Sequence, residues 1–513
     1  MEGVKLLKLH DWQKECLDLW ANNGFKGIIN AVTGSGKTFL ALSAIKRLEI
    51  VSYRHLKIKI VVPQKFLAKQ WIEEIRKQLG VKRKDIGVYS GDKKNLGRKY
   101  TIYVINSARY TLAKHILDDL KNNFAVFLIA DECHHYGSSE NNRIFDFVRF
   151  ISKESTYYAL GLSATPEIAD FNKISAPLGN EVYSYNLERA IRDKIISQFI
   201  LFKINVSLNS VENEEYDALS DSLGKNLFAL KKERPELNIS SKDRFFLNLQ
   251  RIAKEGNEVS ELAKNTMNLM FMRRTLSHMA SERPACTISI INSLPNKTRI
   301  ILFCERIKSA EMLYSSLNAQ YLDEVGLYHS NMVDFTRREM LEKYRYGHFR
   351  LLICCKALDE GLNIPSTDVG IIVSTSLNAR QRIQRMGRIL RKSDDIKRIY
   401  FLSVVQSNED MELSFGLNTL GNAVPIIECF YKNGTINVLG KYQNLQKKVL
   451  DSFDIKESSS DMLRLLKKNI NTALVRGDFL LSEDICREHI NTSKSKNEKN
   501  YWITVLHMVR LCA

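Results

Sequence analysis

A glycine-rich turn, AVTGSGKT at residues 31–38, is the feature that most restricts how this chain can fold. The apolar residues Ile28 and Ile29 come just before it and are predicted to end a buried strand. The stretch TFLALSAIKRL (38–48) carries apolar residues at the spacing of a helix face. A strand, a glycine-rich turn and a helix, in this order, allow backbone N–H groups to surround a phosphate. The sequence therefore predicts an α/β fold with an anion site at the turn.

The residues of the turn match the chemistry of a nucleotide-binding loop. Glycines allow the backbone to curl so that its N–H groups face phosphate oxygens, and the start of the next helix adds partial positive charge. Lys37 is expected to reach the β and γ phosphates, and the Thr38 hydroxyl to hold Mg²⁺. The usual pattern begins with Gly, whereas this one begins with Ala31. The predicted ATP-binding residues of the turn are Thr33, Gly34, Ser35, Gly36, Lys37 and Thr38.

Two acidic residues follow a second predicted strand. AVFLIA (125–130) is uniformly apolar, and Asp131 and Glu132 come directly after it. Carboxylates at the C-terminal end of a parallel strand face the same crevice as the glycine-rich turn. We expect Asp131 to hold Mg²⁺ and Glu132 to polarise the water that attacks the nucleotide.

A basic helix is predicted much later in the chain, at QRIQRMGRILR (381–391). Gln384, Arg388 and Arg391 lie within two turns, and the two arginines share one face because they are three residues apart. Such a helix can simply be an exposed basic surface. The sharper interpretation is that its guanidinium groups enter the nucleotide crevice from a second domain and stabilise the charge on the phosphates.

Cysteine and histidine spacing argues against a structural zinc site. None of the nine cysteines forms a C-x-x-C pair, and several lie in apolar, strand-like runs, so they are expected to be reduced core residues. An alternative metal site of Cys133, His134 and His135 is disfavoured, because adjacent residues cannot easily turn toward one ion.

Strand-like and helical runs alternate over two separate regions, each of which predicts a parallel sheet covered by helices. A helix-forming stretch lies between these regions, either as a spacer or as an insertion that contacts nucleic acid. A predicted hairpin with an Asn433–Gly434 turn and a mostly helical extension follow the second region. The expected domains are residues 1–205, residues 206–294 (helical insertion), residues 295–408 and residues 409–513 (C-terminal accessory region with a possible protein partner).

The chain is basic, since 76 Lys and Arg stand against 58 Asp and Glu, for a net charge of +18. A polyanionic partner is one explanation, because phosphates attract Lys and Arg through counterion release. No apolar run reaches the roughly 20 residues of a membrane helix, and the N-terminal residues do not resemble a signal peptide. We therefore expect a cytoplasmic protein with no membrane partner.

In their order along the chain, these pieces resemble the motifs of helicase superfamily 2, of the DEAD/DEAH-box type. The resemblance covers most of residues 5–405, and within the superfamily it is to XPB-like DNA helicases and restriction-system motor subunits. Residues 183–199 and 370–392 carry the XPB-like features, and we expect the chain to lack the damage-recognition region that precedes the motor in XPB. The motif stretches are HDWQKE (10–15), AVTGSGKT (31–38), VVPQKFLAKQW (61–71), YSGDKK (89–94), VINSAR (104–109), DECH (131–134), GLSATP (161–166), ILFCERIKSAEML (301–313), CCKALDEGLNIP (354–365) and QRMGRILR (384–391).

The resemblance implies two tandem RecA-like domains that close around ATP, and it implies roles for single residues. Gln13 would read adenine, and Asn363 would lie near the ribose at a position where the family often has Asp. Lys356 likewise replaces a common Thr. Catalysis would use Glu132, Gln384, Arg388 and Arg391. Coupling would use Asp131, His134, Ser163, Ala164 and Thr165. Nucleic acid would contact Lys65, Asn106, Ser107 and Gly361.

Together, these features predict an ATP-dependent helicase or translocase that uses ATP and Mg²⁺ and moves along or unwinds duplex DNA. Two alternatives stay open from the sequence. One is an RNA helicase, because DECH occurs in both classes. The other is an ATP-gated DNA clamp that recruits a separate effector.

Overall fold

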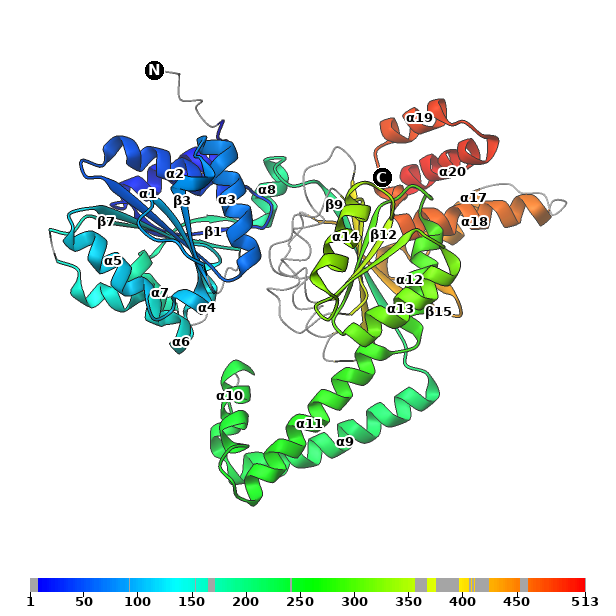
Figure 1. Ribbon diagram of the computed structural model, residues 1–513. Helices are drawn as coiled ribbons and strands as arrows, with labels where there is room; N and C mark the ends of the chain where they lie inside the picture. The colour runs from blue at the N-terminus through cyan, green and yellow to red at the C-terminus, as the bar shows by residue number, and fades with distance from the viewer. Residues whose placement is uncertain are drawn as a thin grey trace. The chain divides into compact units, whose positions relative to one another are not determined.

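The computed structural model describes residues 8–91, 93–152, 154–164, 171–239, 242–355, 367–374, 396–405, 407, 410, 424–452 and 460–512. These residues form two compact units, one built from the chain up to Gln198 and the other starting at Phe199. Each unit contains its own eight-stranded sheet with helices packed against it (Figure 1). The predicted fold class, two tandem RecA-like domains with parallel sheets, is therefore confirmed.

The first sheet has the strand order β4-β3-β5-β2-β6-β7-β1-β8. All neighbouring strands run parallel except the short β4, which pairs antiparallel with β3. The strands are β1 (Lys26–Ala31), β2 (Leu56–Val62), β3 (Ile86–Ser90), β4 (Lys93–Lys94), β5 (Tyr100–Val104), β6 (Ala125–Ala130), β7 (Tyr157–Ser163) and β8 (Glu181–Tyr185). Because the strands are parallel, the loops that follow them all leave from one edge of the sheet.

Helices cover both faces of this sheet, with α1, α2 and α3 on one side and α5 and α7 on the other (Figure 1). The helices are α1 (Asp11–Asn22), α2 (Lys37–Val51), α3 (Lys65–Leu79), α4 (Ile105–Ala108), α5 (Leu112–Lys121), α6 (Ser139–Asn142), α7 (Phe171–Leu178) and α8 (Leu187–Arg192). The described part of this unit also contains three 3₁₀ helices, η1 (Arg83–Asp85), η2 (Cys133–Tyr136) and η3 (Arg143–Phe150).

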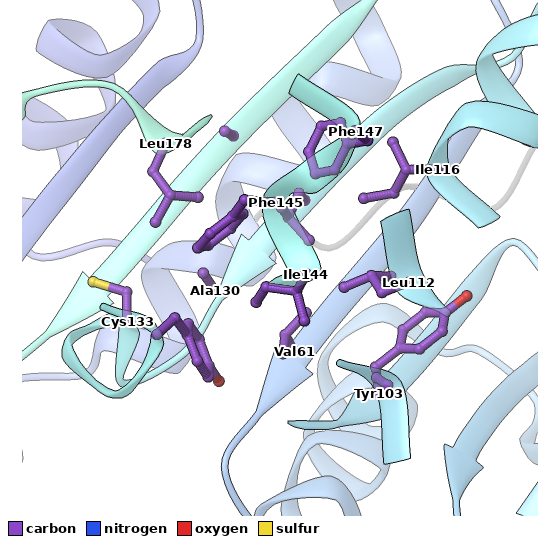
Figure 2. Close-up of a cluster of buried hydrophobic side chains, with 14 of the residues drawn as sticks. Val61, Tyr103, Leu112, Ile116, Ala130, Cys133, Ile144, Phe145, Phe147 and Leu178 are labelled. Carbon is purple, nitrogen blue, oxygen red and sulfur yellow. The ribbon is translucent and has the colours of Figure 1, made fainter. Parts of the chain in front are cut away.

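One hydrophobic cluster joins the central strands to α5, η3 and α7 (Figure 2). Phe145 and Phe147 of η3 are buried in this cluster together with Val61 of β2 and Leu178 of α7. Cys133, which directly follows the two acidic residues after β6, is fully buried in the same cluster. Its thiol therefore packs in the core, and burial raises its pKa far above the usual range.

The second sheet has the order β11-β12-β10-β13-β14-β9-β15-β16. Its strands are β9 (Phe199–Val206), β10 (Ile300–Cys304), β11 (Val325–Tyr328), β12 (Leu351–Cys355), β13 (Val369–Ile372), β14 (Lys397–Val404), β15 (Ile426–Lys432) and β16 (Thr435–Val438). The helices α13 (Ile307–Gln320) and α14 (Asp334–Arg345) alternate with these strands.

The sequence-based boundary of the first domain at residue 205 is wrong, because β9 belongs to the second sheet. β9 pairs in parallel with β14 along its whole length, from Phe199 beside Lys397 to Val206 beside Val404. A mostly apolar strand such as β9 has the same sequence pattern in either sheet. Only the pairing with the distant β14 assigns β9 to the second sheet. This assignment places the boundary between the two units after Gln198.

The predicted hairpin is present, and it also extends the second sheet. β15 pairs in parallel with β9 and antiparallel with β16. Asn433 and Gly434 form the turn with positive φ values of 52° and 79°, as a tight two-residue hairpin requires. The described residues of the predicted C-terminal accessory region (409–513) thus belong to the second unit.

A helical arm separates β9 from β10, as predicted. Its elements are α9 (Ser210–Glu233), η4 (Pro235–Leu237), α10 (Lys242–Ile252) and α11 (Glu258–Met279). Asn209 caps α9 in a capping box with Glu212, and a small core of six residues, including Leu230, Leu249 and Ile252, joins the helices.

The arm ends earlier than the predicted residue 294, because α12 (Glu282–Ser293) packs against the second sheet. The fully buried Arg283 on this helix donates hydrogen bonds to the Val373 and Leu402 carbonyls at two strand ends.

The C-terminal elements are η6 (Gly440–Tyr442), α17 (Leu445–Ser452), α18 (Ser460–Arg476), η7 (Asp478–Leu480), α19 (Glu483–Thr492) and α20 (Lys496–Cys512). The buried Asp478 joins them to the sheet, because it pairs with Arg398 of β14 and accepts a hydrogen bond from Tyr501. All nine cysteines are free, and eight of them are buried. Among the described helices, none is both long and apolar enough to cross a membrane.

Candidate nucleotide site and nucleic-acid interface

The strand order of the first sheet divides its loop-bearing edge into two halves. The neighbouring strands β6, β7 and β1 end at Asp131, Ser163 and the glycine-rich turn, respectively. The neighbouring strands β3, β5 and β2 end close to Gly91, Asn106 and Lys65. The predicted nucleotide residues therefore occupy one half of the edge, and the predicted nucleic-acid residues of this unit occupy the other.

The glycine-rich turn has the backbone curl that its sequence predicts. Gly34 and Gly36 have φ values of 88° and 96°, in the left-handed region that favours glycine. Gly36 is the N-cap of α2, so the free N–H groups of the first helical turn face the loop. The Ser35 hydroxyl donates to the Val32 carbonyl at 2.8 Å and braces the turn.

Gln13 connects α1 to this turn. Its side-chain oxygen accepts a hydrogen bond from the backbone N–H of His10 at 2.9 Å, and its side-chain nitrogen donates to the Gly36 carbonyl at 3.2 Å. The residue is 1% exposed. Gln13 thus supports the loop backbone, and its predicted contact with adenine stays a prediction.

Lys37 folds back onto the end of β1. Its Nζ donates to the Ala31 carbonyl at 2.8 Å. Burial lowers the pKa of Lys37, while the nearby Glu132 and Asp131 carboxylates act in the opposite direction. Lys37 and the two acidic residues therefore share one electrostatic environment at this half of the edge.

The Asp131 carboxylate is buried and held from two sides. Trp71 of α3 donates to it through Nε1 at 2.8 Å, and the backbone N–H of Glu132 donates at 3.1 Å. The pKa of Asp131 is raised to about 6, mainly by burial and, to a smaller extent, by repulsion from the Glu132 carboxylate. A cation beside Asp131 would favour its ionised form.

Glu132 has an unusual backbone and a carboxylate that few groups approach. Its φ of 48° is in the left-handed region, which a non-glycine residue adopts only when its surroundings hold it there. The buried Oε2 atom has no hydrogen-bond partner among the described residues, and Nδ1 of His134 lies 3.5 Å from it. One carboxylate oxygen is thus available to accept a proton.

His134 connects the acidic residues to the neighbouring strand end. Its Nδ1 lies 3.2 Å from the Ser163 hydroxyl at the end of β7, and Ala164 follows Ser163 in the chain. This contact brings together two motifs that are 29 residues apart.

The residues at this half of the edge fit a magnesium nucleotide. Thr38 lies in the first turn of α2, and with Asp131 it offers the hard oxygen ligands that Mg²⁺ prefers. The buried Thr33 hydroxyl has no hydrogen-bond partner in the described part of the chain. The described residues contain no group of three or more His, Cys, Asp or Glu suited to a metal ion, so the alternative site at Cys133, His134 and His135 is not supported.

The other half of the edge joins three loops. The Ser107 hydroxyl in α4 accepts a hydrogen bond from the backbone N–H of Gly91 at 2.8 Å, and Asn106 accepts one from Arg109 at 2.7 Å. Lys65 begins α3, and a Cβ atom placed on Gly91 would lie 3.3 Å from its Nζ. Lys65, Ser107 and Gly91 are therefore neighbours.

Six predicted site residues lie outside the described residues: Thr165, Gly361, Asn363, Gln384, Arg388 and Arg391.

One residue with a clear place in the site received no role from the sequence. Trp71 is 1% exposed and belongs to the motif stretch 61–71, but only the fold brings its indole N–H to Asp131, 60 residues away.

Comparison with known proteins agrees with this geometry. The family described as type III restriction enzyme, res subunit, matches residues 6–168, and the helicase conserved C-terminal domain matches residues 282–393. The DNA 3'-5' translocase XPB2 of Sulfurisphaera tokodaii is 30% identical over 392 residues, which are 76% of this chain and 80% of XPB2. A putative DNA 3'-5' helicase Rad25 of Haloarcula marismortui is 23% identical over 419 residues, 79% of this chain but only 54% of that protein.

Solved structures share the fold. The Pyrococcus furiosus Hef helicase domain superposes with a TM-score of 0.51 at 16% identity, covering 78% of this chain and 97% of that one. The DNA-bound type ISP restriction-modification enzyme LlaBIII has a TM-score of 0.51 at 13% identity and covers 95% of this chain and 35% of that enzyme.

The match to XPB2 covers 392 residues, more than either unit contains, so it spans both units. The matches therefore confirm an ATP-dependent helicase or translocase that uses ATP and binds nucleic acid. This chain belongs to helicase superfamily 2, among the relatives of the XPB-like DNA translocases.

Proposed function

We propose that the protein hydrolyses MgATP at the glycine-rich turn and uses this energy to move along duplex DNA. The observation that carries the proposal is the grouping of Lys37, Asp131 and Glu132 beyond the ends of β1 and β6, the two strands that flank β7 in the first sheet. The relatives named DNA 3'-5' translocase and DNA 3'-5' helicase support DNA as the track and 3'-5' as the direction.

In the proposed reaction, Lys37 leaves the Ala31 carbonyl and binds the β and γ phosphates. Glu132 accepts a proton from water as the water oxygen bonds to the γ phosphorus, and the bond from that phosphorus to the β–γ bridging oxygen breaks to release ADP. Thr38 and Asp131 would hold Mg²⁺, which supplies positive charge against the phosphates. Arg388, Arg391 and Gln384 are proposed to assist from the second RecA-like domain.

We propose that Lys65, Asn106 and Ser107 hold the sugar–phosphate backbone of the tracked strand. These polar groups lie on adjoining loops, and contacts with phosphate and sugar suit a motor that must move over any sequence. Gly361 of the second domain is proposed to allow close approach of the same strand, and a protein partner for residues 409–513 stays a prediction.

An ATPase assay with a panel of nucleic acids tests the proposal. We expect duplex DNA to stimulate hydrolysis more than single-stranded DNA or RNA, and we expect the protein to displace the third strand of a DNA triplex in an ATP-dependent reaction. Stimulation by RNA alone would favour an RNA helicase. Duplex stimulation without triplex displacement would favour a clamp.

A further inference from the structure

Two adjoining hollows lie along α3 of the first unit, with volumes of about 540 and 590 Å³. They share Glu73, Arg76 and Arg83 in their walls, so they form one continuous groove, which we call the α3 groove. It begins at Lys65, at the N-terminus of α3, and reaches Gly80 and the residues after it.

The charge of the α3 groove is strongly one-sided. Seven Lys and Arg against one Glu leave a net charge of 7 − 1 = +6. Its cations are Lys65, Lys69, Arg76, Lys77, Lys82, Arg83 and Lys93.

None of the seven cations has an ion-pair partner among the described residues. Cations elsewhere on the same unit do: Lys59 pairs with Asp119 at 2.6 Å, and Lys99 pairs with Glu49 at 2.6 Å. Like charges gathered in a concave surface repel one another and concentrate anions there. The groove is therefore suited to an external polyanion rather than to pairing within the protein.

Several of these cations lie along one face of α3. Lys65, Lys69 and Arg76 lie on one face of α3, at intervals of four and seven residues, with Glu73 between them. The 15 residues of α3 span about 22 Å at 1.5 Å per residue. Each strand of B-DNA carries one phosphate per about 3.4 Å of duplex axis, so a helix of this length parallel to the axis covers about six phosphates of one strand.

The lining of the groove also indicates which form of nucleic acid it takes. No aromatic side chain is among its lining residues, so the stacking platform typical of single-strand binding is absent from these described walls. A row of cations without aromatic rings suits the backbone of a paired strand, whose bases stay stacked within the duplex.

We propose that the α3 groove binds the sugar–phosphate backbone of duplex DNA, as an extension of the proposed tracked-strand contacts at Lys65, Gly91 and Ser107. The inference rests on the proposed function, since it assumes DNA as the track. It adds Lys69, Arg76, Lys77, Lys82 and Arg83 as backbone contacts that anchor the duplex beside the tracked strand.

The test compares two charge-matched triple variants of the full chain. The groove variant is Lys69→Ala/Arg76→Ala/Lys77→Ala, which changes three exposed residues of α3 to a residue with high helix propensity. The control is Arg464→Ala/Lys467→Ala/Lys468→Ala, which likewise removes one Arg and two Lys from exposed positions of α18.

Binding is measured by fluorescence anisotropy with a short duplex and with a single strand, over a series of salt concentrations. We expect the groove variant to lose duplex affinity about 10-fold or more and to show a log–log salt slope shallower by about 2–3, since each lost phosphate contact is worth about 0.9. The single-strand affinity and the basal ATPase activity of the groove variant are expected to stay close to those of the parent. The control variant is expected to match the parent in all of these measurements.

The possible outcomes separate this inference from the proposed function. If duplex DNA stimulates the parent, but the groove variant keeps the parent's duplex affinity and salt slope, the groove inference is wrong and the motor proposal stands. An equal loss of duplex affinity in the groove variant and the control variant would show a general charge effect and would also overturn the groove inference. A larger loss for single-stranded than for duplex DNA would overturn the duplex assignment. A parent that neither binds duplex DNA nor responds to it would overturn the proposed function.

Discussion

At the scale of single residues, Glu132 combines a left-handed backbone with a buried carboxylate oxygen that has no hydrogen-bond partner among the described residues. Both features cost folding free energy, and such costs are concentrated at functional sites. Neighbouring Asp131, in contrast, receives two hydrogen bonds. This difference in surroundings supports the proposed roles, in which Asp131 holds a cation and Glu132 accepts a proton.

The Glu132→Gln variant tests the assigned base. We expect kcat for ATP hydrolysis to fall about 10²–10⁴-fold, because the amide cannot accept the proton of the attacking water. ATP and DNA affinity are expected to stay near the parent values, since the change keeps the size of the side chain. Steady-state ATPase and nucleotide-binding measurements check this, and a turnover equal to that of the parent would assign the base elsewhere.

Lys37→Ala removes the cation that is proposed to bind the phosphates. We expect ATP affinity to fall at least about 10–100-fold, since a hydrogen bond to a charged group contributes about 1.5–3 kcal/mol. Lys46→Ala, on the same helix but outside the turn, provides the control. Titration of a fluorescent ATP analogue measures the effect, and normal affinity in the Lys37 variant would refute the assignment of the loop.

Trp71→Phe tests the support that the fold gives to Asp131. The variant keeps an aromatic ring but leaves the buried carboxylate without its indole donor, so the Mg²⁺ concentration needed for half-maximal ATPase activity is expected to rise. Trp20→Phe is a matched control, because the Trp20 indole donates to the Ala159 carbonyl at 2.9 Å away from the site.

Both tryptophan variants are expected to lose about 1–3 kcal/mol of stability, since each leaves a buried acceptor unpaired. Denaturant unfolding measures this loss. Only Trp71→Phe should change the Mg²⁺ dependence, and the same change in the Trp20 variant would show that Trp71 has no special link to the site.

At the scale of elements, the second sheet depends on segments from distant parts of the chain. β9 comes before the helical arm, β14 lies near the end of the second RecA-like region, and β15 belongs to the C-terminal part. The buried pair of Arg398 on β14 and Asp478 in η7 then fixes the C-terminal helices to this sheet. These helices are thus expected to unfold together with the sheet.

Asp478→Ala tests this cooperation. The change leaves the Arg398 guanidinium without its carboxylate partner, and breaking a buried pair in this way costs about 3–5 kcal/mol. Denaturant unfolding should show one destabilised transition for the second unit, whereas Asp461→Ala at an exposed position of α18 should change stability little. A separate early transition confined to the C-terminal helices would contradict the assignment.

At the scale of the whole molecule, a net charge of +18 on a chain that binds a polyanion predicts strong salt dependence. If the motor makes about 6–10 phosphate contacts, DNA affinity should fall about 10³–10⁵-fold between about 50 and 200 mM salt. ATPase activity without DNA should change far less, because the nucleotide site is small and partly buried. ATPase titrations with duplex DNA at several salt concentrations measure the DNA affinity and the activity without DNA. A DNA affinity that does not change with salt would contradict binding through phosphate contacts.

Local sequence determined the chemistry of the nucleotide site. The glycine-rich turn, the acidic pair after 125–130 and the strand and helix runs around them could be predicted because each depends on a few neighbouring residues. The fold class followed from the alternation of such runs, and the order of the motifs indicated the family.

Tertiary structure alone decided which distant segments meet. The sequence could not assign β9 to the second sheet, because an apolar strand has the same pattern whichever partner it pairs with. It could not bring Trp71 to Asp131 or gather the cations of the α3 groove, because these contacts depend on how helices pack on the sheet. Side-chain chemistry is local and can be read along the chain, whereas pairing and burial are long-range and exist only in the folded molecule.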